Sequence, residues 1–296
     1  MIDAQTLTVA AGGIWHGRYG TAPCPVCQPE RRKGQTALTL TDGTLRLLLN
    51  CKKSACAFHD IAAALGITPG SFTPPDPATL AQRDAEKRQE AAKRAAQARA
   101  IWQEAVPIRG TIAETYLRGR GITCALPDTL RFHREAWHGP TARRLPALVA
   151  RVDGGAGFAV HRTWLRADGT GKAPVDPPKA MLGACAGGAV RLACGQDALA
   201  VAEGIETALS LLCGPLTGSV AVWAALSTSG MACLRLAAAP GKLIVATDRD
   251  DRGAGQAAGH KLAERAAALG WAVTMFPAPD GRDWNDVLQD MKEATP

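Results

Sequence analysis

Two pairs of closely spaced cysteines constrain the fold of this chain more than any other feature. Cys24 and Cys27 form the first pair and Cys51 and Cys56 the second, so the spacing is C-x2-C-x23-C-x4-C. Two such pairs supply the four thiolates of a tetrahedral structural zinc site, and soft sulfur ligands argue against magnesium or calcium. His59, three residues after Cys56, offers a substitute for one of the cysteines. The spacing predicts a structural zinc ribbon.

The segment between the cysteine pairs predicts a β-hairpin. Residues 36–40 and 44–49 read as strands on either side of a turn-forming Asp-Gly pair. The Pro-rich stretch 69–77 is typical of a stiff polar linker. Residues 78–104 contain no helix breaker and have high helix propensity. We expect a solvated connecting helix there, although its six basic residues also suit contact with nucleic acid.

The remaining cysteines show no ligand spacing. They are predicted to be small core residues: Cys124, Cys185, Cys194, Cys213 and Cys233. Nine cysteines in 296 residues are too few for a disulfide scaffold, so we expect reduced thiols and a cytosolic protein. We expect no signal peptide and no membrane association, because no apolar run approaches the ~18 residues of a membrane span. The 47% of hydrophobic residues excludes wholesale disorder.

Charge is distributed unevenly along the chain. Residues 77–196 carry 19 Lys and Arg against 10 Asp and Glu, a net charge of +9. Residues 197–296 carry 8 against 12, a net charge of −4. A basic middle followed by an acidic end suggests one region that binds a polyanion and another that binds a cation. A general bias toward arginine would also explain the basic middle.

The C-terminal third alternates short apolar strands with helices. Strands are expected at 199–202, 220–223, 243–247 and 272–276, with helices through 212, near 230–237 and over 254–269. This alternation predicts a parallel sheet covered by helices. Functional groups of such sheets gather at the carboxyl ends of the strands.

Acidic residues follow three of these expected strands. Glu203 follows the first, Asp248 and Asp250 follow the third, and Asp283 and Asp286 lie beyond the fourth. Alternate side chains of a D-x-D sequence at a strand end project the same way, so Asp248 and Asp250 can share one cation. Clustered carboxylates repel one another, and bound Mg²⁺ or Mn²⁺ relieves that repulsion.

Three motifs in this region resemble the Toprim domain, which bacterial primases, topoisomerases and some nucleases share. They are AEGIETALS at 202–210, ATDRDDRGAGQ at 246–256 and GRDWNDVL at 281–288. The resemblance covers about residues 197–291 and implies a Rossmann-like parallel sheet with flanking helices. It implies that Glu203, Asp248 and Asp250 are catalytic and hold Mg²⁺ or Mn²⁺. Asp283 and Asp286 match a further acidic element and are implied as additional metal ligands.

The order of zinc ribbon, basic segment and Toprim domain resembles that of DnaG-type bacterial primases. GFAVHRTWL at 157–165 and PPKAMLG at 177–183 resemble basic elements of the primase catalytic core. In that family these elements face the nucleotide and the template, which implies such roles for Arg162 and Lys179, with Lys172 as a third candidate.

The expected architecture is a multidomain α+β and α/β chain. It comprises a zinc ribbon (1–67), a linker with a charged helix (68–104), a basic mixed α+β part of the catalytic core (105–196) and a Toprim domain (197–296). On the ribbon, basic residues are expected to contact template phosphates: Arg31, Arg32, Lys33, Lys52 and Lys53. Trp15 and Tyr19 are candidates for base stacking.

The resemblance implies a DNA primase, of a small phage or plasmid type or from a related mobile element. It would make short primers on single-stranded DNA from nucleoside triphosphates, with a separate replicative helicase or polymerase as partner. Two alternatives stay open: a Toprim-type metal-dependent nuclease and a catalytically silent nucleic-acid-binding protein. The zinc ribbon and the 177–183 element favour a primase over a nuclease. For His161, nucleotide contact and core packing are both open, whereas Trp164 is predicted to be buried.

Overall fold

The computed structural model describes residues 3–43, 46–68, 76–216, 218–249 and 253–293. The chain divides into two compact units, Met1–Arg88 and Gln89–Pro296. Asp250, a predicted metal ligand, lies outside the described residues, as does most of the expected Pro-rich linker.

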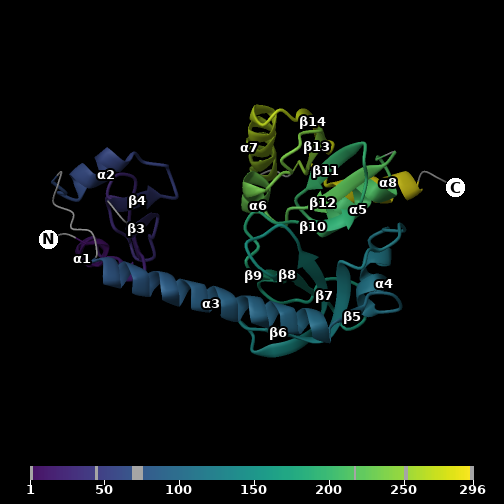
Figure 1. Ribbon diagram of the computed structural model, residues 1–296, viewed down its shortest axis with the longest axis horizontal. Helices are drawn as coiled ribbons and strands as arrows, with labels where there is room; N and C mark the ends of the chain where they lie inside the picture. Colours follow the sequence, from purple (N-terminus) through teal and green to yellow (C-terminus); the bar gives the residue numbers. More distant parts are fainter. Residues whose placement is uncertain (1–2, 44–45, 69–75, 217, 250–252, 294–296) are drawn as a thin grey trace. The chain divides into compact units, whose positions relative to one another are not determined.

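The first unit is a small antiparallel sheet with two helices (Figure 1). Its strand order is β1-β2-β3-β4. Its elements are α1 (Ala4–Ala10), β1 (Ile14–Trp15), β2 (Gly20–Ala22), β3 (Leu38–Asp42), β4 (Leu47–Cys51) and α2 (Phe58–Ala64). Strands β3 and β4 pair antiparallel, so the predicted hairpin is confirmed.

Alternation of side chains along β3 explains how so small a unit closes a core. Leu38 and Leu40 are fully buried, whereas the alternate residues Thr39 and Thr41 are partly exposed, as the period of two in a strand requires. Asp3 caps α1 by accepting a hydrogen bond from the backbone N–H of Thr6 at 2.6 Å. The small core also includes two cysteines, Cys24 and Cys51.

Helix α3 (Pro77–Glu104) confirms the predicted long helix. Asp76 precedes it and accepts hydrogen bonds from the backbone N–H groups of Ala78 and Thr79 at 2.9 and 3.0 Å, which satisfies two of the donors at the helix start. Its buried side chains, Ala98 and Trp102, both belong to the second unit.

The second unit contains two sheets. The first is antiparallel, with the order β5-β6-β7-β8-β9, and helix α4 contacts β6 and β7. These elements are β5 (Val106–Pro107), α4 (Ile112–Gly119), β6 (Leu130–His138), β7 (Arg143–Val152), β8 (Ala159–Trp164) and β9 (Lys179–Gly183). Along β7, Ala147 and Val149 pack in the same core as Trp102 of α3. Leu148 and Ala150 face the other way, into the core that contains α4.

The second sheet of this unit has the order β10-β12-β11-β13-β14. Strands β11 to β14 are parallel, as predicted, and β10 pairs antiparallel with β12. The elements are β10 (Val190–Ala193), β11 (Ala198–Ala202), α5 (Ile205–Cys213), β12 (Val220–Ala224), α6 (Thr228–Cys233), β13 (Lys242–Thr247), α7 (Ala254–Ala268), β14 (Ala272–Pro277) and α8 (Trp284–Glu293). Strand β10 was not predicted. The helix expected near 230–237 is shorter, because Leu234 already has an extended backbone.

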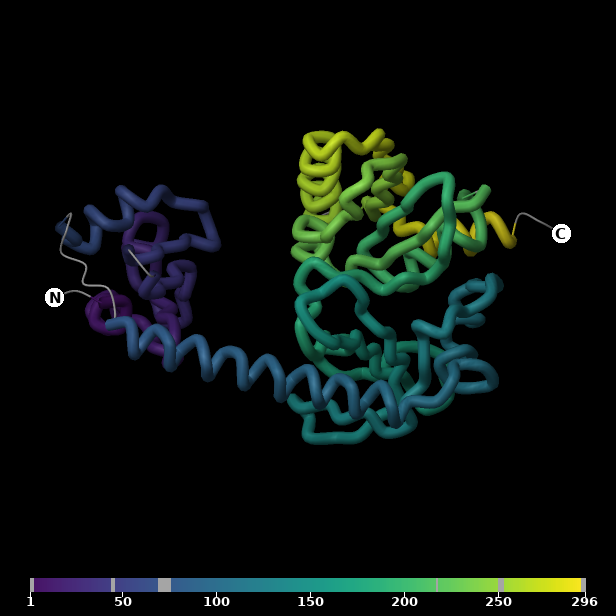
Figure 2. Tube along the Cα trace, viewed as in Figure 1, coloured from purple at the N-terminus to yellow at the C-terminus, as the bar shows by residue number. Residues whose placement is uncertain are grey.

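Helices cover both faces of this second sheet (Figure 2). Leu199 and Val201 of β11 pack in the core with α6 and α7, whereas Ala200 and Ala202 pack with α5 and α8. The latter core continues into the antiparallel sheet and includes Leu148. The two sheets of the second unit therefore share one hydrophobic core.

In the part of the chain that the structure describes, no helix has the length and apolarity to cross a membrane.

Candidate functional site

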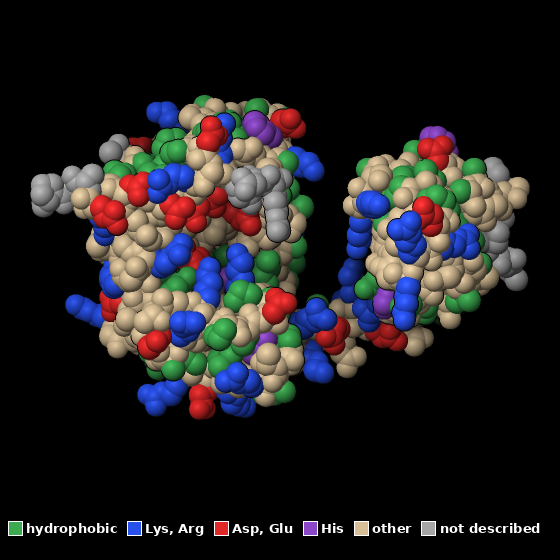
Figure 3. All heavy atoms as spheres, turned by 180° about the vertical axis from the view of Figure 1, so that it is seen from behind, with side chains coloured by type: hydrophobic (Ala, Val, Ile, Leu, Met, Phe, Trp, Pro, Cys, Tyr) green, Lys and Arg blue, Asp and Glu red, His purple; other side chains and the backbone are tan. Residues whose placement is uncertain are grey.

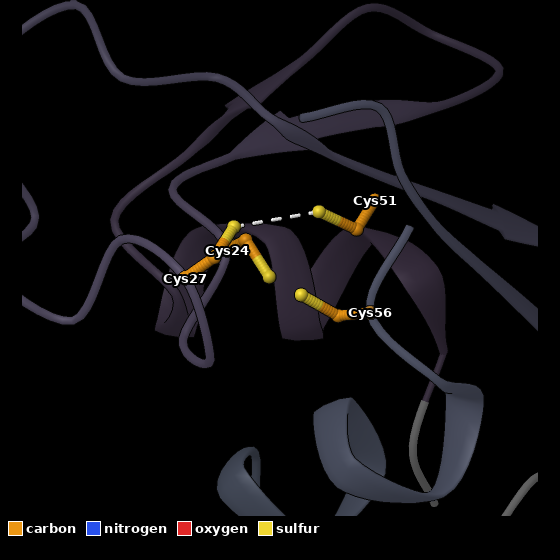
Figure 4. Close-up of side chains that lie close together, drawn as sticks. All are labelled: Cys24, Cys27, Cys51 and Cys56. Carbon is orange, nitrogen blue, oxygen red and sulfur yellow. Dashed lines mark hydrogen bonds between the residues drawn. The ribbon is translucent and has the colours of Figure 1, made fainter. Parts of the chain in front are cut away.

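The four predicted zinc ligands come together in the first unit. Cys24 and Cys27 lie in the loop after β2, Cys51 ends β4, and Cys56 lies before α2. All four sulfur atoms are within 4.8 Å of one another (Figure 4). The side-chain oxygen of Gln28 fixes the first loop by accepting hydrogen bonds from the backbone of Cys24 and Ala37, at 3.2 and 3.1 Å.

The electrostatics of this cluster suit a cation. Burial acts to raise the pKa of Cys51, but backbone N–H groups of Ser54, Cys56 and Lys53 donate to its sulfur and lower the pKa to about 6. Burial and the neighbouring sulfurs raise the pKa of Cys56 to about 12. Four convergent soft ligands with no open position fit a structural zinc ion.

His59 is not part of this cluster. Its side chain is 82% exposed, and its Nε2 lies 3.1 Å from Oδ1 of Asp60. The group of convergent ligand atoms contains the four cysteines without it.

The surface of the first unit carries the predicted basic residues, all of them exposed: Arg31, Arg32, Lys33, Lys52 and Lys53. Tyr19 is 42% exposed and lies beside the ring of His16, with 4.9 Å between the ring centroids. Trp15 is only partly exposed, because it packs against the small core. Tyr19 is therefore more accessible to a base than Trp15.

In the second unit, two predicted carboxylates meet at one edge of the parallel sheet. Glu203 directly follows β11 and Asp248 directly follows the neighbouring β13. A Cβ atom added at Gly255 would lie 3.7 Å from Oε2 of Glu203 and 3.8 Å from the backbone oxygen of Asp248. Both residues therefore border the start of α7.

Asp248 is held by two hydrogen bonds from separate elements. Its Oδ1 accepts from the backbone N–H of Trp284 and its Oδ2 from the hydroxyl of Thr207, both at 3.3 Å. Burial nevertheless raises the pKa of Asp248 to about 6, and the negative charges of Asp283 and Glu203 add to the rise. A buried carboxylate beside two others is a site where a divalent cation would be stabilising.

Asp283 and Asp286 occupy the start of α8. Oδ1 of Asp283 accepts hydrogen bonds from the backbone of Asn285 and Asp286, each at 2.8 Å, and Oδ2 of Asp286 accepts from the backbone of Asp283 at 3.2 Å. This reciprocal arrangement is a helix capping box. The negative charge of Asp283 held there contributes to the raised pKa of Asp248.

Among the described residues, no three carboxylates converge as the cysteines do. The residues present still fit a divalent cation, because Asp248 and Glu203 are oxygen ligands whose mutual repulsion a cation would relieve. Asp250 lies outside the described residues.

Glu206 has a structural role that the sequence did not indicate. Its Oε1 accepts a hydrogen bond from the Tyr116 hydroxyl at 2.7 Å and lies 3.0 Å from Nζ of Lys172. Burial acts to raise the pKa of Glu206, but Lys172 and Tyr116 outweigh it and lower the pKa to about 2. Glu206 thus joins α5 to α4 and to the segment between β8 and β9. Lys172, predicted to bind nucleotide, is committed to this ion pair.

The other two predicted basic residues lie on the antiparallel sheet. Arg162 is on β8, and its guanidinium lies over the Trp164 ring, 5.0 Å from the centroid. Burial lowers the pKa of Arg162. Lys179 begins β9 and is exposed. Trp164 is 2% exposed, which confirms its predicted burial.

His161 lies beside Arg162 on β8 and is buried. Within the described part of the chain, its Nδ1 has no hydrogen-bond partner. Burial lowers the pKa of His161 to about 4, and the charges of Lys179, Lys172 and Arg162 act in the same direction. A neutral, buried imidazole agrees with the core-packing alternative.

Charges of opposite sign face each other across a hollow in the second unit. Figure 3 shows Asp and Glu side chains gathered on the parallel-sheet side of the hollow and Lys and Arg side chains on the antiparallel-sheet side. An acidic surface attracts cations and a basic surface attracts polyanions, so the two sides of the hollow favour ligands of opposite charge.

The prediction for the remaining cysteines is wrong for Cys194 and Cys233, which are exposed. Cys124, Cys185 and Cys213 are partly buried and pack against the main hydrophobic core, as predicted. Short polar or glycine-containing stretches surround several of them, so their burial depends on tertiary contacts that spacing does not reveal.

Comparisons with known families assign the C-terminal part of the chain. Residues 198–293 match a family model described as a Toprim domain, and residues 92–192 match one described as a domain of unknown function (DUF7146). The chain therefore contains a Toprim domain, and the predicted mixed architecture with a Toprim sheet and an N-terminal cysteine cluster is confirmed. Among curated proteins, no match was found.

Solved structures that resemble the chain include three primase structures. The RNA polymerase domain of Mycobacterium tuberculosis primase DnaG is 18% identical with a TM-score of 0.41, over 70% of this chain and 81% of that one. A DnaG catalytic core is 15% identical with a TM-score of 0.43, over 69% and 76%. The Aquifex aeolicus primase, with zinc-binding and RNA polymerase domains, is 11% identical with a TM-score of 0.40, over 99% and 81%.

Proposed function

We propose that this protein is a primase that synthesises short primers on single-stranded DNA by metal-dependent nucleotidyl transfer. Two observations carry the proposal: Glu203 and Asp248 follow neighbouring strands of the Toprim sheet, and an acidic side and a basic side face each other in the same unit (Figure 3). Phosphoryl transfer needs mainly positioning and charge stabilisation, and these two walls supply both.

In this proposal Glu203, Asp248 and Asp250 hold one or two Mg²⁺ or Mn²⁺ ions, with Asp283 and Asp286 nearby. Bound metal would lower the pKa of the attacking 3′-hydroxyl and neutralise the leaving pyrophosphate. The capping box keeps Asp283 in place, and the hydrogen bonds from Trp284 and Thr207 orient the Asp248 carboxylate.

Arg162 and Lys179 are proposed to bind the incoming triphosphate. Both residues lie on the antiparallel sheet. Lys179 is exposed, whereas stacking over Trp164 restricts the side-chain conformation of Arg162. Lys172 acts indirectly: by pairing with Glu206 it fixes the basic sheet to the helix that follows Glu203.

The four-cysteine cluster is proposed to hold one structural zinc ion, and the exposed cations around it to bind template phosphates. The proposed functional division is a zinc ribbon at 1–67, a connecting part at 68–104, a basic core part at 105–196 and the Toprim part at 197–296. We further infer a cytosolic enzyme of phage, plasmid or mobile-element type that cooperates with a separate replicative helicase or polymerase.

The test is incubation of the full chain with single-stranded DNA, labelled nucleoside triphosphates and Mg²⁺ or Mn²⁺. Short labelled products that depend on template are expected. Asp197→Ala is a matched control, because Asp197 lies just before β11, at the opposite end from Glu203. Shortening of labelled template without incorporation would instead indicate a Toprim nuclease, and binding without either reaction would indicate a silent binding protein.

A further inference from the structure

Cys124 and Cys213 meet in the second unit, at the opposite end of α5 from Glu203. Cys124 lies in the loop after α4 and Cys213 is the last residue of α5, and both are partly buried against the same hydrophobic core. They belong to the two different family matches, 92–192 and 198–293.

The sulfur of Cys213 is surrounded by donors. It accepts hydrogen bonds from the backbone N–H groups of Thr123 and Cys124, each at 3.3 Å. An interaction between the two side chains lowers the pKa of Cys213 and raises that of Cys124. A neutral thiol is a weak acceptor, whereas a thiolate is an acceptor only, so the two convergent backbone donors match the anionic form.

The cations near the pair contact the backbone of the loop that carries Cys124. Arg118 of α4 donates to the backbone oxygens of Ile122 and Cys124 at 2.7 and 2.9 Å, while also pairing with Glu114. Lys292 of α8 donates to the backbone oxygen of Gly121. The carboxyl end of α5 opposes a negative sulfur. Burial acts to raise the pKa of Cys213, but the Cys124 thiol and the backbone N–H groups outweigh burial and lower the pKa to about 5.

We propose that Cys213 is a thiolate and, with Cys124 as resolving thiol, forms a site of reversible oxidation by peroxide. The Cys213 thiolate attacks one oxygen of hydrogen peroxide, giving a sulfenic acid and hydroxide. The Cys124 sulfur then gives up its proton and attacks the Cys213 sulfur, and the sulfenic hydroxyl leaves as water. One peroxide is reduced, two thiols are oxidised, and a disulfide links α5 to the loop after α4.

The pH dependence of alkylation tests the thiolate. The full zinc-loaded chain is treated with iodoacetamide between pH 6 and 8, and each cysteine is followed by fragment-ion mass spectrometry. The alkylation rate of Cys213 is expected to change by less than about threefold over this pH range. The alkylation rate of an ordinary exposed thiol rises about tenfold per pH unit. Exposed Cys194 and Cys233 are the internal comparators. A Cys213 rate that rises in parallel with theirs, or no Cys213 labelling, overturns the proposal.

Peroxide treatment tests the pairing. Non-reducing mass spectrometry of the wild-type chain should detect a Cys124–Cys213 disulfide that dithiothreitol removes. In Cys124→Ser, which keeps a hydroxyl donor, the Cys213 sulfenic acid should persist and be trapped by dimedone. The disulfide in the wild type needs no variant, so a folding failure of Cys124→Ser leaves the test intact. Absence of this disulfide under conditions that oxidise Cys194 or Cys233 would rule the pair out.

Discussion

The cysteine cluster of the first unit and the carboxylate edge of the second place their ligands in different ways. The four sulfurs are already within 4.8 Å of one another, and all come from the segment between Cys24 and Cys56. Glu203 and Asp248 come from two strand ends, and backbone and hydroxyl donors hold Asp248 individually. The first site is formed by local chain geometry, whereas the second depends on the assembly of a whole sheet.

This difference is the one expected between the proposed structural metal site and the proposed catalytic metal site. The cysteine cluster has no open position, so a bound ion would serve only the fold. At the carboxylate edge, burial and repulsion raise the pKa of Asp248, so the folded chain stores unfavourable electrostatic energy there. A cation bound at this site would relieve that repulsion.

The largest expected effect is the loss of the first unit when its metal site is broken. Cys51→Ser should abolish zinc binding and unfold residues 1–67, because structural zinc supplies about 10–16 kcal/mol in small domains. The core of that unit contains only its own residues, so the thermal transition of the second unit should not move. Metal analysis and calorimetry check both statements, with Cys194→Ser as the control. Equal destabilisation of both units would show that the cysteine site does not stabilise the first unit alone.

The second expected effect is loss of activity without loss of structure. Asp248→Ala should reduce primer synthesis by about a thousandfold or more, because it deletes a carboxylate at the acidic edge. Affinity for single-stranded DNA should stay within about twofold, since the basic residues are untouched. Primer assays and fluorescence anisotropy measure the two quantities, with Asp197→Ala as control. Full activity, or collapse of template binding, would show that Asp248 has another role.

Sequence reasoning found the features that depend on local pattern. The hairpin, helix α3 and the parallel strands followed from periodicity and propensity, and the convergence of Cys24 and Cys51 followed from paired spacing. These features are set within short stretches of chain, so they can be predicted before tertiary structure is known.

Sequence reasoning missed the features that depend on distant partners. Strand β10 is only Val190–Ala193, and it joins the sheet because β12 offers it a free edge. Glu206 lies three residues after Glu203 and resembles another metal ligand in the sequence. Its partners Tyr116 and Lys172 are 90 and 34 residues away, and no spacing rule connects them. The Cys213 environment arises in the same way.

The third prediction concerns Glu206, which lies about one helical turn from Glu203 and is paired with Lys172 and Tyr116. Glu206→Gln should lower the free energy of unfolding by about 2–4 kcal/mol, since Lys172 and Tyr116 lose a partly buried charged partner. The folded-state pKa of about 2 is below the ordinary 4.5, so this stabilisation is present above about pH 4.5 and is lost as pH falls toward 2.

Denaturant unfolding of Glu206→Gln and Glu203→Gln at pH 7 and pH 3 measures this contrast. Glu203→Gln should lose activity with little change in stability. Adding Lys172→Met to Glu206→Gln should cost less than the two single changes summed, because they share one ion pair. Equal stability losses in the two glutamate variants would show that Glu206 has no special structural role.

The smallest expected effect is a pH-dependent gain in stability at the acidic edge. The folded-state pKa of Asp248, about 6, is above its ordinary 3.8, so the folded state binds a proton more tightly than the unfolded state does. Without divalent cations, the wild-type chain should therefore lose stability as pH rises from about 4 to 6, and the loss should persist above pH 6. Asp248→Asn carries no charge to titrate, so it should be more stable than wild type by about 1–3 kcal/mol at pH 7.5 and equal to it near pH 4.

Thermal unfolding with and without Mg²⁺ completes the measurement. Mg²⁺ should raise the Tm of the wild type and leave that of the Asn variant nearly unchanged, because a ligand stabilises only the state that binds it. An Asn variant that is less stable at pH 7.5, or that gains as much from Mg²⁺ as the wild type does, would show that Asp248 serves the fold and that the acidic edge does not hold a cation.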